Sequence, residues 1–303
     1  MMRSLILSVA LLAALGACGK KTPADAAPEP AAVADAGAPP AMGADDPAGE
    51  PVETASVLPD PQTTDIADLP RTITVDNDTL KADISFDEAI FGYAPAMAMD
   101  VVEDARIRLT AIEEDAAAYK KAEPQYFHPY GLKIDWKLTG AAGGLAGLEG
   151  FQYSYTGGAH GNYMTDGRIY STLTGDQLRL SDLFTDPAAD MAAQMDFIHD
   201  AIAKQKTIAA NNPGAYATFL GEAKDAVTER DVLGGEISLV ASTEPGKLGG
   251  YVIHFAPYEI GSYAEGAYHI VVPQSAFHEF LKPDFTGAFA GEPVDVQRPD
   301  KQN

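Results

Sequence analysis

The side chains best suited to catalysis or metal binding are few in this sequence and widely spaced. There is one cysteine, Cys18, so neither a disulfide framework nor a cysteine-rich zinc site can form. No His-Glu-x-x-His motif occurs, and no two histidines stand four residues apart on a predicted helix. The six histidines occupy positions 128, 160, 199, 254, 269 and 278. We therefore predict no metal site.

Nucleophilic and carboxylate catalysis find equally little support. Ser154 has His160 six residues further on, but the sequence contains no Gly-x-Ser-x-Gly elbow. Adjacent glutamates on one helix surface cannot face each other across a cleft, as a glycosidase requires. His254 and His269 each lie within an apolar strand, where we expect them on its polar face rather than as ligands. We predict that the protein is not an enzyme and needs no cofactor, with a peptidoglycan-modifying hydrolase as the alternative.

One local pattern is distinctive: a tyrosine-rich strand runs into a glycine-rich loop that contains a histidine. The glycines allow the positive φ angles of a sharp turn. The histidine could close that turn by bonding to the backbone, or it could contact a partner together with its neighbouring tyrosines. Both interpretations stay open. The residues of this candidate loop are Tyr155, Thr156, Gly157, Gly158, His160 and Gly161.

The elements that would position this loop are strands around one long helix. Residues 72–75 and 80–86 alternate polar and apolar side chains, which predicts two strands. Between residues 98 and 119 the apolar side chains recur three and four apart, which predicts an amphipathic helix. Residues 140–147, rich in glycine, are expected to be a flexible connection, since no Lys-Ser/Thr follows them as in a phosphate loop. Further strands are predicted at 130–138, 148–156 and 163–173.

The second half of the chain reads as helices followed by strands. Asp186 caps a helix that has Pro187 at its first position and a buried stripe at 191, 195, 198 and 202. A second helix follows Pro213, then strands at 236–240, 251–255 and 268–272 and a helix at 273–281. This order predicts an α+β fold with largely antiparallel pairing. We expect two sub-domains, 71–145 and 146–285, and a flexible tail at 286–303.

The first seventy residues are expected to lie outside the fold. Residues 1–17 combine Arg3, an apolar run too short to span a bilayer and small residues before Cys18, which predicts a lipoprotein signal peptide with the lipid on Cys18. Gly19 favours the outer membrane in a Gram-negative cell, so the chain would face the periplasm. Residues 18–70 are rich in alanine, proline and carboxylates and hold no aromatic residue, which predicts a disordered tether.

The net charge is −23, from 21 Lys and Arg against 44 Asp and Glu. Nucleic acid is therefore not an expected partner, because binding phosphates requires clustered basic residues. The acidity favours solubility or a cationic partner. It is not confined to the tether, since the remainder of the chain is acidic as well.

Three separated motifs give the sequence a family resemblance. They are Tyr155-Thr-Gly-Gly-Ala-His-Gly161, Leu173-Thr-Gly-Asp-Gln-Leu-Arg-Leu-Ser-Asp-Leu-Phe184, and a downstream set that contains Pro257, Tyr258, Glu259, Gly266 and Pro273. In this order they resemble the extracellular domain shared by RsiV-type anti-sigma factors and the non-catalytic region of PdaC-type peptidoglycan deacetylases. Residues 72–138 look like the companion domain found upstream. The resemblance covers about residues 70–285.

This resemblance implies a recognition domain rather than an enzyme. RsiV-type members bind lysozyme, whereas this sequence lacks their transmembrane and sigma-binding segments and also lacks the deacetylase domain of the PdaC type. We therefore expect an envelope lipoprotein that binds a lysozyme-like muramidase or peptidoglycan. An envelope scaffold without a soluble ligand is a further alternative.

Overall fold

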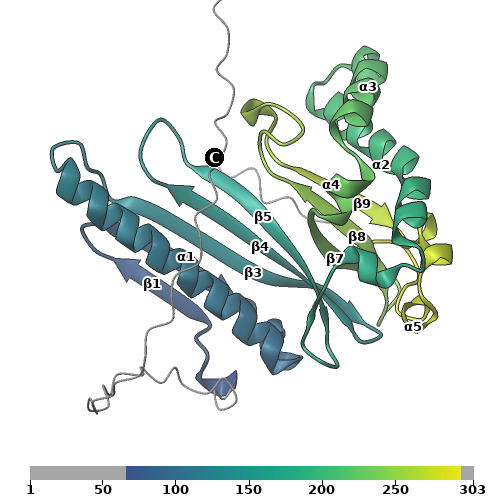
Figure 1. The fold of residues 1–303 in the computed structure, drawn as a ribbon, viewed down its shortest axis with the longest axis horizontal. Coiled ribbons are helices and arrows are strands. Elements are labelled where there is room, and N and C mark those ends of the chain that lie inside the picture. The colour runs from purple at the N-terminus through teal and green to yellow at the C-terminus, as the bar shows by residue number, and fades with distance from the viewer. Residues whose placement is uncertain (1–65, 295–303) are drawn as a thin grey trace, which may run out of the picture. The chain divides into compact units, whose positions relative to one another are not determined.

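A six-stranded sheet and a three-stranded sheet carry the fold of the computed structural model (Figure 1). The structure describes residues 66–294, which belong to one compact unit. The predicted signal peptide, Cys18 and nearly all of the predicted tether lie outside these residues. Within the described part, no helix has the length and apolar character needed to cross a membrane.

The larger sheet follows the chain order from edge to edge. All its neighbouring strands pair antiparallel except β2 and β3, which are parallel because helix α1 (Pro95–Ala122) crosses over between them. The prediction of largely antiparallel pairing is confirmed. The strands are β1 (Thr72–Asp76), β2 (Leu80–Phe86), β3 (Tyr130–Ala142), β4 (Leu145–Tyr155), β5 (Asn162–Ser171) and β6 (Gln177–Leu178).

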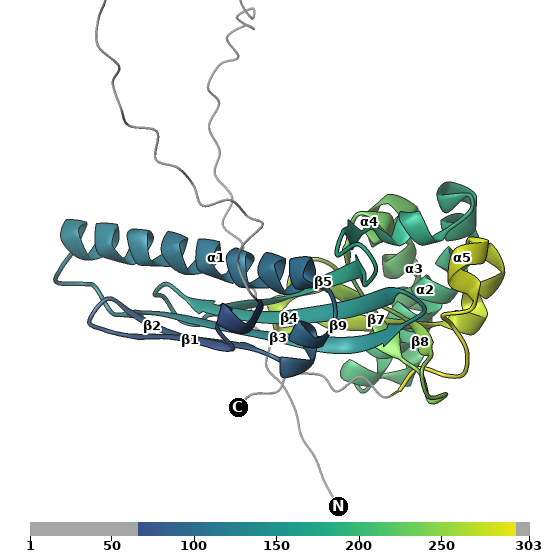
Figure 2. The same ribbon diagram turned by 90° about the horizontal axis from the view of Figure 1, so that it is seen from below.

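Helix α1 covers one face of this sheet (Figure 2). Pro95 stands at its first turn, where a missing N–H costs no hydrogen bond. Its apolar stripe packs as the spacing predicts: Ala98, Val102, Ala105 and Ala116 are fully buried. They meet the alternate side chains of β2 and β3, among them the buried Trp136. Apolar side chains that recur about every 3.6 residues on the helix and every 2 residues on the strands thus pack into one core.

The smaller sheet is antiparallel and is covered on its outer face by helices. It consists of β7 (Glu236–Ala241), β8 (Leu248–Phe255) and β9 (Tyr268–Pro273). The stripe predicted for residues 191–202 is buried against it, in the same core as Tyr251 and Ile270. The helices of this half are α2 (Pro187–Ala209), α3 (Tyr216–Ala226), α4 (Glu229–Leu233) and α5 (Pro283–Thr286). The protein therefore has the predicted α+β fold.

Three glycines let the two sheets approach closely. A Cβ atom placed on Gly147 would lie 2.4 Å from the backbone nitrogen of Leu239, and one on Gly140 would lie 2.6 Å from that of Ala241. Gly167 of β5 would similarly meet the backbone of Ile237 at 2.5 Å. These glycines come from three adjacent strands, and β7 crosses directly over them. We call this set the glycine crossing.

Several boundaries differ from those predicted. Residues 140–147 are not a flexible connection, because β3 and β4 continue to a tight turn at Gly143 and Gly144 with the glycine crossing covered by β7. The residues on either side of position 145 also share one sheet, since β4 begins there and pairs with β3. The segment 273–281 forms two short 3-10 turns rather than one helix, because Phe277 between them has a non-helical φ of −142° and its side chain is buried in the core.

The ordered chain extends past both predicted ends. Leu69 is buried in the core under α1, although it falls within the predicted tether. At the other end, Ala288 and Phe289 are buried, and Leu248 donates its N–H to the Ala288 carbonyl. The prediction of a flexible tail is therefore wrong for residues 286–294. The reason is Phe289, whose ring packs edge-on against Phe277 at 5.3 Å between centroids.

We predict that Gly147→Ala destabilises the fold by about 1–3 kcal/mol, because the new methyl group must displace the backbone of β7. Urea unfolding measures the change. Gly221→Ala is the matched control, since Gly221 lies on α3 with open space around it and alanine favours helix. Equal stability of the two variants would contradict the glycine crossing.

Candidate binding surface

Two segments 100 residues apart in the sequence meet beside the ends of β4 and β5. One is the candidate loop 155–161, and the other is the turn 256–266 between β8 and β9. The Tyr263 hydroxyl donates a hydrogen bond to the Gly161 carbonyl at 2.7 Å, and the Tyr263 ring stacks on the His160 ring at 4.1 Å between centroids. The structure therefore joins two of the three predicted motif regions.

Aromatic rings continue outward from this contact. Tyr258 lies 5.4 Å from Tyr263 between ring centroids, Tyr163 lies 6.2 Å from Tyr263, and Phe151 lies 6.2 Å from Tyr163. These separations are typical of interacting aromatic rings. Some of the rings are exposed to solvent, with Tyr258 at 65%. We call the set the aromatic surface: Phe151, Tyr153, Tyr155, His160, Tyr163, Tyr258 and Tyr263.

The glycines of the candidate loop shape this surface. Gly157 and Gly158 have φ angles of 102° and 91°, which side chains rarely tolerate, as the sequence predicts. The Tyr155 hydroxyl then donates to the Gly158 carbonyl at 3.2 Å. Gly161 serves packing instead, because a Cβ atom there would lie 2.4 Å from the Tyr153 ring. Thr156 is exposed at the start of the loop.

The turn 256–266 holds Tyr258 in a strained conformation. Tyr258 has a φ angle of 77°, which is unusual for a bulky residue. Its neighbour Glu259 stabilises the turn, since the carboxylate accepts the Ala256 N–H at 2.7 Å. Pro257, which is half-buried, lies between Ala256 and Tyr258. Such strain persists only where the surroundings impose it, and it is typical of functional positions.

A buried lysine fixes the same turn to helix α2. The Lys206 Nζ donates to the Ile260 carbonyl at 2.6 Å and lies 3.2 Å from Glu265. Glu265 also accepts hydrogen bonds from the Ser262 N–H and from the Tyr268 hydroxyl. Burial raises the pKa of Glu265, but these hydrogen bonds outweigh it and lower the pKa to about 2. The turn is therefore held by an ionised carboxylate over the whole neutral range.

The other predicted residues have simpler roles. Gly266 ends the turn with a φ angle of 82°. Pro273 is at the far end of β9 from Tyr268, where it pairs with Gly250, so it lies apart from the aromatic surface. His160 places its Nδ1 3.0 Å from the Gly161 carbonyl, and within residues 66–294 no hydrogen bond joins it to Ser154. The Ser154–His160 pair therefore forms no catalytic arrangement in the described structure.

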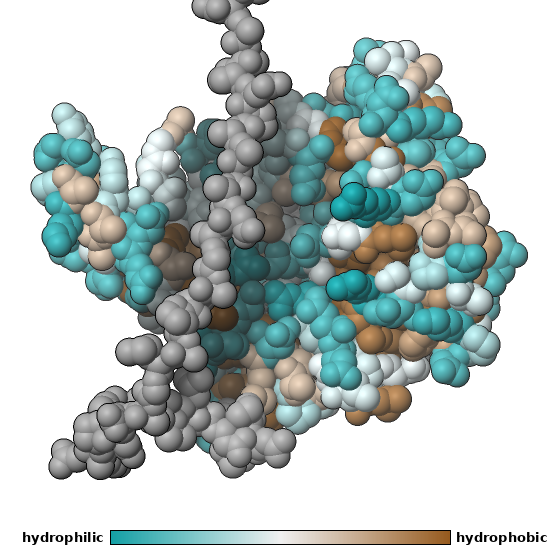
Figure 3. All heavy atoms as spheres, viewed as in Figure 1, coloured by the Kyte–Doolittle hydropathy of each residue, from teal (hydrophilic) through white to brown (hydrophobic). Residues whose placement is uncertain are grey.

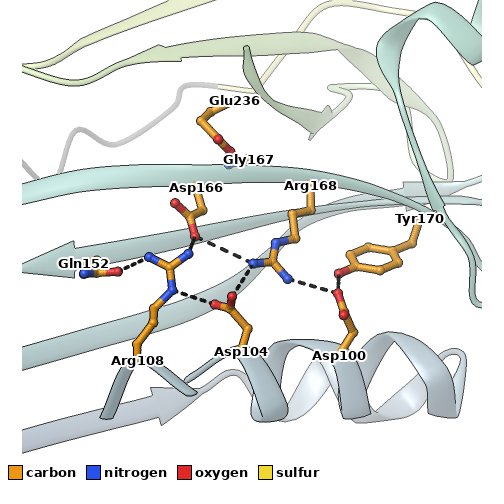
Figure 4. Close-up of polar contacts among 9 residues, drawn as sticks. All are labelled: Asp100, Asp104, Arg108, Gln152, Asp166, Gly167, Arg168, Tyr170 and Glu236. Carbon is orange, nitrogen blue, oxygen red and sulfur yellow. Dashed lines mark hydrogen bonds and ion pairs between the residues drawn. The ribbon is translucent and has the colours of Figure 1, made fainter. Parts of the chain in front are cut away.

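A network of charged side chains, not predicted from the sequence, fastens α1 to the sheet (Figure 4). Arg108 of α1 contacts Asp166 of β5 at 2.7 Å, and Arg168 of β5 contacts Asp100 of α1 at 3.0 Å. Asp104 joins both arginines, at 2.8 Å to Arg108 and 3.2 Å to Arg168. Residues 100, 104 and 108 share a helix face, and 166 and 168 share a strand face, so the two periodicities align them. Only knowledge of the helix–sheet contact could have revealed the network from the sequence.

The network is most enclosed near β5. The Asp166 side chain is 7% exposed, and its burial raises the pKa of the carboxyl, opposed by Arg108 and Arg168. The Arg168 guanidinium lies over the Trp136 ring at 4.7 Å. Every charged group contacts one of opposite sign, as buried ions require. We therefore interpret the network as structural. Within the described residues, no group of three or more His, Cys, Asp or Glu side chains could hold a metal ion.

The strand histidines form a buried pair between the two sheets, not an exposed polar face. His254 and His269 are 3% and 6% exposed, and their Nδ1 atoms are 2.7 Å apart. The Nε2 atom of His254 lies 2.8 Å from the Ser238 hydroxyl. The glycine crossing explains the burial, since a Cβ atom on Gly167 would be 2.8 Å from the His254 ring. Burial, together with His269, holds the pKa of His254 well below its usual value.

Comparisons with known proteins support part of the family resemblance. Residues 68–163 match the family model described as Deacetylase PdaC. This part of the chain is thus similar to the PdaC family. This match spans β1 to the start of β5 and includes the candidate loop, but less than half of the chain. No curated protein matches the chain.

Two solved structures of DUF3298 family proteins are similar to this chain. The one from Bacteroides fragilis is 19% identical, with a TM-score of 0.43, over 72% of this chain and 95% of its own. The one from Pseudomonas aeruginosa is 16% identical, with a TM-score of 0.47, over 75% of this chain and 100% of its own.

The buried histidine pair predicts acid sensitivity. Because the folded pKa of His254 is depressed, the unfolded chain binds a proton near pH 6.5 that the folded chain does not. The free energy of unfolding should therefore fall as the pH drops below 6.5, by about 1 kcal/mol at one pH unit below that value. Urea unfolding at several pH values measures this loss. His254→Gln should flatten the profile, whereas His128→Gln, at an exposed position, should retain it.

Proposed function

We propose that this protein is a cell-envelope lipoprotein whose folded domain recognises a partner through the aromatic surface and performs no chemistry itself. The observation that carries this proposal is the pair of segments 155–161 and 256–266, locked together by the His160–Tyr263 stack with Tyr258 exposed beside it. Rigid, exposed tyrosines bind with little loss of conformational entropy, and they dominate many interfaces.

The aromatic surface resembles a binding site in its composition and also because its side chains are held rigidly before any partner binds. Tyr258 has a strained backbone with a positive φ angle, and Lys206 fixes the turn 256–266 that contains it. The absence of a side chain at Gly161 lets the Tyr153 ring pack against its backbone. Preorganisation of this kind reduces the cost of ordering side chains on binding. By contrast, each charged group of the network between α1 and β5 in Figure 4 is engaged in an ion pair with another member.

The partner that we favour is a cationic, lysozyme-like muramidase. The net charge of −23 would accelerate its encounter with the domain, and the effect would weaken with salt. The resemblance to the RsiV-type domain points to the same class of partner. Peptidoglycan is the alternative ligand, since tyrosine rings can also cover the apolar faces of sugars.

Binding to hen egg-white lysozyme tests this proposal. The acyl-free chain from residue 19 onward should bind at about 0.05 M ionic strength and more weakly at about 0.15 M. Tyr258→Ala should weaken binding about tenfold, because an exposed aromatic anchor is lost. Surface plasmon resonance gives both rates, with the salt dependence expected in the association rate.

Tyr126→Ala is the matched control for this experiment. Tyr126 is 68% exposed, lies between α1 and β3, and takes part in none of the ring contacts that build the aromatic surface. Equal losses from Tyr126→Ala and Tyr258→Ala, or no binding at either ionic strength, would refute muramidase recognition at this surface. Turnover of peptidoglycan that disappears in a folded His160→Ala variant would instead establish the hydrolase alternative.

The anchor is tested separately. We propose that Cys18 carries the lipid, that residues 18–70 act as the tether, and that the outer membrane of a Gram-negative cell holds the chain. Cys18→Ser should abolish incorporation of labelled palmitate and release the protein into the soluble envelope fraction, because several acyl chains are needed for firm attachment. A Cys18→Ser protein that still carries label in the membrane fraction would rule out this assignment.

A further inference from the structure

A second concave region lies beside β7 and belongs to neither the aromatic surface nor the ionic network. It consists of two cavities, of about 600 and 440 Å³, that share a wall made by Gly234, Gly235 and Glu236. These volumes fall in the range of sites for small ligands. On the face drawn in Figure 3, apolar residues show between hydrophilic ones over this half of the molecule. The proposed recognition function does not use this region.

Glu236 is the central charged group of the region. One of its carboxylate oxygens accepts the Gly167 N–H at 3.1 Å, and Figure 4 shows the side chain directed at that residue. Within residues 66–294, the other oxygen has no hydrogen-bond donor and the carboxylate has no ion-pair partner. Burial raises the pKa of Glu236, opposed by the Gly167 hydrogen bond. A half-buried carboxylate with a free oxygen can accept a cationic donor from a ligand.

One arginine lines each cavity, and within residues 66–294 neither guanidinium makes a hydrogen bond or an ion pair within 4 Å, although the Arg230 charge also acts on Asp231 of the same cavity. Arg230 of α4 lines the larger cavity, and Arg179, which follows β6, lines the smaller. The Arg179 backbone N–H is used by Asp182, but its side chain is not. Arginine binds carboxylates in a fixed, two-pronged geometry. A cation site at Glu236 is thus flanked on both sides by sites for anions.

The remaining walls favour a short organic molecule over a simple ion. Ile253 and Phe255 line the larger cavity, and Leu178 and Leu180 line the smaller. The larger cavity also contains Asp231 and Glu259. Both are committed to backbone N–H groups, of Thr228 at 2.8 Å and of Ala256 at 2.7 Å. Their negative charge opposes a polyanion such as a nucleotide and favours a ligand with an ammonium group.

We propose that these cavities bind a short zwitterionic peptide, with its ammonium group on Glu236 and its carboxylate on Arg230. Arg179 extends the site for a second carboxylate of a longer peptide. The apolar walls accept the intervening carbon chain, and the small residues Gly234 and Gly235 leave the backbone between the cavities open to it. The chemistry is one of binding only, since no bond of the ligand is broken.

Titration of the acyl-free chain with the tripeptide Ala-Lys-Ala tests this inference, with isothermal calorimetry and backbone amide shifts as readouts. The shifts should centre on Gly235, Glu236 and Arg230. Glu236→Gln keeps an oxygen for the Gly167 N–H but removes the charge, and it should weaken binding at least tenfold. The peptide acetylated at both amino groups should lose binding to the same degree.

Glu229→Gln is the matched control, because Glu229 lies exposed on α4 and outside both cavities. It should leave the affinity unchanged, and so should Tyr258→Ala. Arg230→Met should weaken the peptide but not its C-terminal amide. The inference is overturned if the peptide does not bind, if the acetylated peptide binds equally, or if Tyr258→Ala rather than Glu236→Gln abolishes binding. The last result would place the peptide on the aromatic surface, whereas the others leave muramidase recognition intact.

Discussion

The close passage of β7 over three glycines is the constraint on which the other features depend. Two stacked sheets usually pack about 10 Å apart, with side chains between them. Here the missing side chains of Gly140, Gly147 and Gly167 let backbone touch backbone. This contact places β7 on the larger sheet, and the pairing of β7 with β8 and of β8 with β9 positions the other two strands. The turn 256–266 therefore lies next to the candidate loop, and the Glu236 carboxylate accepts a hydrogen bond from the Gly167 N–H.

Polar groups on the two faces of the larger sheet are satisfied in distinct ways. Burial lowers the pKa of His254, which is hydrogen-bonded to His269 and to Ser238. The network between α1 and β5 stays charged, because each carboxylate finds an arginine. Buried ion pairs rarely stabilise a protein more than apolar residues would, but a broken pair costs about 3–5 kcal/mol. We therefore interpret the network as fixing the register of α1 against the sheet. Apolar contacts alone are less directional and would specify that register less strictly.

Local periodicity carried most of the prediction of elements. The buried stripes of α1 and α2, the alternation in β2 and the positive φ angles of Gly157 and Gly158 were all predictable, because each depends on neighbours along the chain. The glycines at 140–147 were misinterpreted because flexibility and close packing favour the same residue. The burial of His254 and the charge network were not predictable, since each needs a partner from another element. The candidate site divides in the same way: His160 was identifiable, but its contact with Tyr263 was not.

The proposal of recognition rather than catalysis rests on which charged groups are already engaged in contacts within the fold. An enzyme holds at least one acid, base or nucleophile ready for substrate, at a cost in stability. In the turn 256–266, Glu259 and Glu265 accept hydrogen bonds from backbone N–H groups, and in the aromatic surface His160 is stacked on Tyr263. What remains exposed is aromatic area on a rigid frame, which suits binding. Glu236 is different: within the described residues its second oxygen has no hydrogen-bond donor, and it lies in the wall between cavities that Arg230 and Arg179 line, so its charge is available to a small charged ligand.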